Sequence, residues 1–141
     1  MTDLNPDCLS ILLCDMVIED KRTNKKSLIG TFNDILAATI PASHPCMYLV
    51  VSLTNCRHEH DLQIEISRFT DESGTESLLR LGGKVHAKNP LQVIDLVFEL
   101  HGLPLKGFGC HTIDLTVQPS GERIGQRSFY VRQMPPSQTP E

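Results

Sequence analysis

The sequence predicts an all-β fold, a two-sheet antiparallel β-sandwich of seven to nine short strands. Two observations predict it: apolar and polar residues alternate with period two through most of the chain, and clusters of Gly, Pro, Asn and Asp separate the alternating segments. Short strands punctuated in this way are typical of immunoglobulin-like sandwiches, and an even barrel is the architectural alternative.

The clearest predicted strand covers residues 46–54, where four apolar side chains share one face. These are Met47, Leu49, Val51 and Leu53. The same alternation turns three further sets inward: Leu62, Ile64 and Ile66; Ile113, Leu115 and Val117; and Phe129 with Val131. Because the chain has no Trp, two Tyr and five Phe, the core is predicted to be aliphatic.

Two hairpins are predicted. One hairpin joins the strand that ends near Val117 to the strand that begins near Ile124. Its turn is formed by Pro119, Ser120, Gly121 and Glu122. The polar run 19–26 connects residues 9–18 to residues 27–32. Residues 9–18 are apolar on both faces, which suits a central strand in a layer covered on both sides, with a buried helix as the alternative.

Two segments are ambiguous in their period. Residues 33–39 fit a strand or one helical turn, and residues 91–101 fit a strand or a helix. The strand is favoured for the second because Phe, Ile and Val are common in strands, with Gly102 and Pro104 expected to end it. Further turn signals lie at residues 71–74, Gly82-Gly83, Asn89-Pro90 and residues 106–109.

Length and tail composition predict the domain organisation. A chain of 141 residues fits a single domain, here residues 1–133. Residues 134–141 hold Pro135, Pro136 and Pro140 and are predicted to form a disordered tail.

Charge and hydropathy exclude several classes of protein. A net charge of −4 argues against nucleic-acid binding, and no apolar run of about 18 residues is present to span a membrane. The first residues lack the basic region of a signal peptide. Five cysteines at scattered spacings do not suggest a disulfide framework, so a reducing compartment, the cytoplasm, is predicted.

An ordered set of short stretches runs through nearly the whole chain. It comprises Leu12-Leu13-Cys14-Asp15, Gly30-Thr31-Phe32-Asn33-Asp34-Ile35, Pro41-Ala42-Ser43-His44, residues 48–54, Asn89-Pro90-Leu91, residues 99–103 and residues 124–131. As a set they resemble an uncharacterised family of small bacterial β-sandwich proteins, a domain of unknown function. The resemblance implies the fold, and it implies no catalytic residue.

The sharpest chemical cluster in the sequence is Cys56, His58 and His60. These residue types are ligands of zinc and copper, and alternate residues of an extended chain point the same way. A fourth ligand would come from elsewhere, with His44, His101 and His111 as the candidates. The alternative interpretation is a polar loop between two core strands.

Other motifs fall short of a catalytic or cofactor site. Cys110 and His111 are adjacent on a strand and therefore point to opposite faces. Residues 71–76 lack the later ligands of a calcium loop, and Gly82-Gly83-Lys84 lacks the first glycine and the hydroxyl of a phosphate loop. No catalytic residue and no cofactor is therefore predicted.

The resulting functional hypothesis is a non-enzymatic protein-interaction or structural module. Its partner would be a protein, or a second copy that forms a homodimer through an edge strand, at residues 28–32 or 129–132. Lys21, Arg22, Lys25 and Lys26 form a basic hairpin tip, for which contact with an anionic partner or lipid headgroups is one interpretation and a solvated turn without a partner is the other. The alternative is a metal-binding protein or metal-dependent enzyme with its site at Cys56, His58 and His60.

Overall fold

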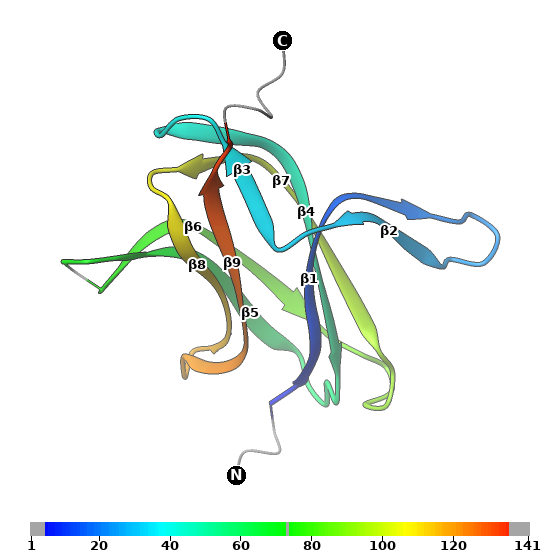
Figure 1. Cartoon of the computed structure of the whole chain (residues 1–141). Helices are drawn as coiled ribbons and strands as arrows, with labels where there is room; N and C mark the ends of the chain where they lie inside the picture. Colours follow the sequence, from blue (N-terminus) through cyan, green and yellow to red (C-terminus); the bar gives the residue numbers. More distant parts are fainter. Residues whose placement is uncertain (1–4, 73, 136–141) are drawn as a thin grey trace.

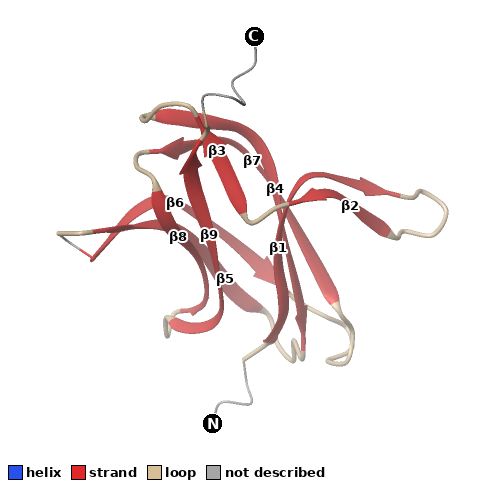
Figure 2. Cartoon of the chain, viewed as in Figure 1, coloured by secondary structure: helices blue, strands red, loops and turns tan. Residues whose placement is uncertain are grey.

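The computed structural model describes residues 5–72 and 74–135, and within them the chain forms nine strands in two facing sheets (Figure 1). The strands are β1 (Asp7–Glu19), β2 (Lys26–Thr31), β3 (Asp34–Ala37), β4 (Ala42–Thr54), β5 (His60–Thr70), β6 (Gly74–Val85), β7 (Ile94–Leu105), β8 (Gly109–Gln118) and β9 (Glu122–Gln133). These residues contain no helix (Figure 2). The predicted all-β two-sheet fold is confirmed.

One sheet has four strands in the order β2-β1-β4-β7, and the other has five in the order β3-β9-β8-β5-β6. Every pairing is antiparallel except that of β3 with β9, which is parallel. The expectation of purely antiparallel sheets is therefore corrected for the five-stranded sheet. The chain leaves β2 in one sheet and enters β3 in the other after only Phe32 and Asn33, so β3 aligns with the last strand of the chain.

The core lies between the two sheets and follows the predicted alternation. Met47, Leu49, Val51 and Leu53 of β4 are all fully buried. The inward residues predicted for β5, β8 and β9 are also buried: Leu62, Ile64, Ile66, Ile113, Leu115, Val117, Phe129 and Val131. Phe129 is the largest of the fully buried side chains.

Both predicted hairpins are present, but β1 is not covered on both sides along its length. β1 pairs with β4 only as far as Cys14, and from Cys14 to Glu19 its pairing continues with β2 alone. Its 13 residues reach about 43 Å at roughly 3.3 Å per residue, so its end projects from the sandwich (Figure 1). Met16 and Ile18 are therefore exposed.

Two turn signals of the sequence lie inside strands. Gly82 and Gly83 belong to β6, which is the edge of its sheet. β7 continues through Gly102 and Pro104, and its register with β4 is kept. Gly102 has φ +70° and changes which face of β7 is buried. Leu100 is buried before it, and Leu103 and Leu105 are buried after it. Pro104 is tolerated because β7 is also an edge strand.

The other uncertain segments are settled by strand pairing. Residues 34–37 are the strand β3, one of the two options for that segment. Because β3 pairs with β9, residues 129–132 are not an open edge, and that suggestion is wrong. β2 is an edge, as suggested for residues 28–32.

The described part of the predicted tail is short. The amide of Met134 donates to the carbonyl of Ala37 at 2.9 Å and extends the pairing with β3. Residues 136–141, where most of the predicted disorder falls, lie outside the described residues. Within residues 5–72 and 74–135 the structure holds no helix that could span a membrane.

Arg127 joins the two sheets where the first half of β1 has an open edge. Its Nη1 donates to the carbonyl of Ile11 at 2.8 Å, and its Nη2 contacts Oδ1 of Asn33. Arg127→Met should lower the free energy of unfolding by about 1–3 kcal/mol, because it leaves these acceptors without their donor. Urea denaturation measures the change.

Arg123 supplies the matched control on the same strand. It is exposed and lies 3.4 Å from Asp114 in a surface ion pair, so Arg123→Met should change stability by less than about 1 kcal/mol. Equal losses for the two variants would contradict the bridging role of Arg127.

Candidate functional site

The outer face of the four-stranded sheet carries two rows of side chains that cross three strands. Leu12, Val50 and Val97 are aligned in an apolar row, with Val97 37% exposed. Cys14, Tyr48 and Glu99 are aligned in the next row. The face therefore changes from apolar to chemically reactive side chains within two residues along each strand.

The reactive end of this face gathers a cysteine, a carboxylate and a histidine. Cys46 of β4 lies directly opposite His101 of β7, and Glu99 is two residues before His101. Oε2 of Glu99 is 2.6 Å from Nε2 of His101. The ligand atoms of Cys46, Glu99 and His101 all lie within 4.8 Å of one another. We call these three residues the Cys46 cluster.

Tyr48 borders the Cys46 cluster on the same face. It lies directly opposite Glu99 across β4 and β7. Loss of solvent raises the pKa of Tyr48, and the charge of Glu99 raises it further. The phenol therefore keeps its proton and remains a hydrogen-bond donor beside Glu99.

The three residues predicted as metal ligands lie in different environments. Cys56 is fully buried, and burial raises the pKa of its thiol. His58 is exposed in a loop, whereas His60 begins β5 and is buried. Cys56 and His58 lie in the loop that follows β4 and the left-handed Asn55 (φ 62°), and only His60 belongs to a strand.

Among the described residues only the Cys46 cluster brings three such ligand atoms within 4.8 Å, so Cys56, His58 and His60 are not gathered to that spacing. The rings of His58 and His60 are 6.2 Å apart. Burial lowers the pKa of His60, and the neighbouring His58 lowers it further. Metal binding at these residues stays a prediction.

Sequence reasoning overlooked the Cys46 cluster, although a signal was present. Glu99 and His101 alternate on one face of a predicted strand, as paired ligands do. Cys46 is more than fifty residues away, and only the register of β4 with β7 places it beside them.

The end of the β1–β2 hairpin, residues 15–31, projects from the sandwich, and we call it the arm (Figure 1). Met16 lies opposite Ile29 across the two strands, and Ile18 is next to them on the same face. The side chains are 49%, 45% and 47% exposed, respectively. The arm therefore presents a small apolar surface that the described residues leave uncovered.

The predicted basic run lies at the tip of the arm, where Lys21, Arg22 and Lys25 are exposed. The carboxylate of Asp20 accepts a hydrogen bond from the amide of Arg22 at 2.8 Å and closes the turn. Lys26 is 3.6 Å from Glu19 across the hairpin. The tip is thus an ordered turn with cationic side chains directed to solvent.

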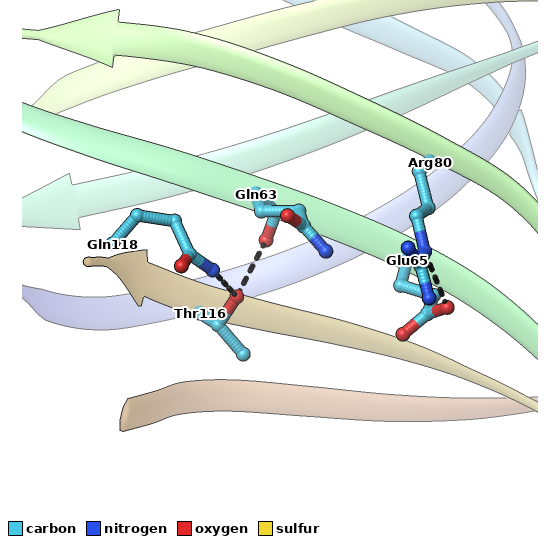
Figure 3. A network of polar contacts seen from close by, with 5 residues as sticks. All are labelled: Gln63, Glu65, Arg80, Thr116 and Gln118. Atoms are coloured by element: carbon cyan, nitrogen blue, oxygen red, sulfur yellow. Dashed lines mark hydrogen bonds and ion pairs between the residues drawn. The ribbon is translucent and has the colours of Figure 1, made fainter. Parts of the chain in front are cut away.

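The outer face of the five-stranded sheet has a shallow hollow of about 450 Å³ next to Gly82 and Gly83. Figure 3 shows the polar network beside it: Gln118 donates to Thr116 at 3.1 Å, Thr116 donates to the carbonyl of Gln63 at 3.4 Å, and Arg80 is 2.9 Å from Glu65. Asp61 and Lys84 are 3.0 Å apart. Because these groups pair with one another, the hollow is a weaker candidate than the arm or the Cys46 cluster.

Cys110 and His111 point to opposite faces, as predicted, since His111 is fully buried and Cys110 is half-buried. Nδ1 of His111 is 3.0 Å from the carbonyl of Gly109, and its ring packs 5.1 Å from that of Phe129. His111 is therefore a core residue. Residues 71 and 72 form the turn between β5 and β6, and Gly82-Gly83-Lys84 lies within β6.

Comparison with known proteins identifies a family without assigning an activity. A model described as a family of unknown function, DUF6941, matches residues 9–132. No curated protein matches the chain.

Solved structures match only distantly. A β-glucosidase from Listeria innocua matches with a TM-score of 0.47 and 9% identity over 91% of this chain. The alkylpurine DNA glycosylase AlkC from Pseudomonas fluorescens matches with a TM-score of 0.43 and 15% identity over 71%. The chain spans 16% and 27% of these two proteins, and matches of this quality assign it no function.

Proposed function

This chain belongs to the family of unknown function DUF6941, and from that premise we propose that it is a non-enzymatic binding module whose arm binds an extended, acidic segment of a protein partner. The observation that carries the proposal is the arm itself, which projects from the sandwich with an open strand edge, exposed apolar residues and a basic tip.

The open edge favours a polypeptide as the partner. β2 pairs with β1 on one side only. The backbone N–H and C=O groups on the other side can accept an added strand, the mode in which many domains bind extended peptides. A lipid surface offers no such strand.

The side chains of the arm define the chemistry of that added strand. On the face of β2 that carries Ile29, the neighbouring residues are Ser27 and Thr31. An apolar residue of the partner is therefore expected beside Ile29. Residues 19–26 hold four basic and two acidic side chains, so this segment has a net charge of 4 − 2 = +2, whereas the whole chain has −4. Charge complementarity therefore favours acidic residues beside that apolar residue.

The proposal includes the cellular setting and the unit that binds. All five cysteines, each within the described part of the chain, are free thiols. This agrees with a reducing compartment, for which we propose the cytoplasm. The binding unit would be a single domain of residues 1–133.

Selection from a random display library of linear peptides tests the proposal. We expect enrichment of peptides in which acidic residues flank an apolar residue. Ile29→Asp should weaken their binding at least about tenfold, because it removes an apolar contact and adds a charge that repels the acidic peptide. Fluorescence anisotropy of the selected peptides measures the affinity.

Leu91→Asp is the matched control. Leu91 is 84% exposed in the connection between β6 and β7, outside the arm, and its replacement should leave the affinity unchanged. Equal loss in both variants would contradict the proposal. So would a homodimer in sedimentation velocity that Ile29→Asp dissociates, because a second copy would then occupy the arm.

A further inference from the structure

The Cys46 cluster is the strongest feature that the proposed function leaves unexplained. The Cys46 cluster combines a thiol, a carboxylate and an imidazole, and it belongs to the sheet face beside β7 and not to the arm. We propose that Cys46, Glu99 and His101 bind one zinc ion on the outer face of the four-stranded sheet.

The backbone holds the three ligands in a fixed arrangement. Cys46 and His101 are direct partners across β4 and β7, and Glu99 lies one alternation before His101. Side chains of directly opposite residues are about 5 Å apart at Cβ. The register of two long paired strands therefore positions all three donors on one face without any contribution from a flexible loop.

The distances are close to those of a tetrahedral zinc site. Zinc bonds of about 2.0–2.3 Å to sulfur, nitrogen and oxygen place neighbouring ligand atoms about 3.3–3.8 Å apart. The ligand atoms here lie within 4.8 Å of one another, so rotation about side-chain bonds is sufficient to close the site. The 2.6 Å contact between Glu99 and His101 would lengthen as both ligand atoms turn toward the metal.

The donor set selects among metals. A thiolate and an imidazole are poor ligands for calcium or magnesium, which prefer oxygen, and they suit zinc well. Tyr48 lies directly opposite Glu99 across the two strands, where a donated hydrogen bond would orient the carboxylate as outer hydrogen bonds do in established zinc sites. With three protein ligands, a water molecule would complete the tetrahedron.

The site is accessible to a metal from solvent. β7 is an edge strand, and the side chains of His101 and Glu99 are 64% and 50% exposed. Cys46 is half-buried. Because none of the three is in the core, replacing them should leave the fold intact, and metal binding can be measured separately from folding.

Titration of the full chain with Co²⁺ under anaerobic, reducing conditions tests the proposal. Cobalt takes the place of zinc and reports a bound thiolate by a charge-transfer band in the near ultraviolet. We expect one cobalt per chain, displaced by one zinc. Cys46→Ser should abolish the band. His101→Gln should weaken zinc binding by more than the roughly 10–100-fold that is typical of losing a hydrogen-bond partner of a ligand.

Matched controls decide between sites. Cys110→Ser replaces another half-buried cysteine, in the other sheet, and His86→Gln replaces another exposed histidine; neither should change the titration. No thiolate band, or a band retained in Cys46→Ser, would overturn the proposal. A band lost only in Cys56→Ala would overturn it and place the metal with His58 and His60. The peptide test of the arm is independent of all these outcomes.

Discussion

Acidification should destabilise this protein, beginning below about pH 6.5. Burial is the main cause that lowers the pKa of His44, His60 and His111. The folded chain therefore takes up protons at these side chains only at a lower pH than the unfolded chain does. The unfolded chain takes up protons below about pH 6.5, where the folded chain does not. The free energy of unfolding is therefore fully retained above that pH and falls as the pH drops toward the lowered pKa values.

His111 gives the sharpest form of this prediction because it is fully buried. Each histidine that is protonated only on unfolding contributes a slope of at most about 1.4 kcal/mol per pH unit. His111→Gln should remove the contribution of His111 to the dependence of the free energy of unfolding on pH. Urea denaturation between about pH 8 and pH 5 measures that slope. His86→Gln, at an exposed position, should leave the slope unchanged. A flat profile in the wild-type chain would contradict the prediction.

Replacement of Phe129 by alanine should lower the free energy of unfolding by about 3–5 kcal/mol. Phe129 is fully buried between the sheets and packs against the ring of His111. The loss of stability has two parts. The variant forgoes the hydrophobic free energy of burying the phenyl ring, and the tightly packed core retains a cavity where the ring was. Such a change approaches the whole stability of an ordinary domain.

Phe69 makes the comparison specific, because it is the same residue type at 49% exposure near the end of β5. Phe69→Ala should cost less than about 1 kcal/mol. Thermal or urea denaturation monitored by circular dichroism measures both variants. If Phe69→Ala were as harmful as Phe129→Ala, the position of the core between the two sheets would be wrong.

Strand identity was readable from the sequence where one face of a strand is buried. β4, β5 and β8 each keep apolar residues on one face for several alternations, and β9 does so only at Phe129 and Val131. The inward residues of all four strands are those expected. Gly82-Gly83 in β6 was misread because glycine favours turns, whereas an edge strand tolerates it. Pro104 in β7 was misread for the same reason.

The candidate sites could be read only in part. The basic tip follows from local sequence, because a hairpin involves only neighbouring segments. The open edge of β2 does not follow, because it depends on the order of strands in the sheet. The exposure of Met16 and Ile18 does not follow, because it depends on where β4 stops pairing with β1. An apolar strand end has the same sequence whether a second layer covers it or solvent does.

By itself, the sequence determined the all-β class, the two hairpins and the inward face of each clear strand, because these depend on period-two alternation and on turn residues close together in the chain. Only the tertiary structure decided the parallel pairing of β3 with β9, the burial of Cys56 and the meeting of Cys46 with Glu99 and His101. Each of these depends on the register between strands far apart in sequence. That register is set by packing of the whole core, and a local sequence pattern does not determine it.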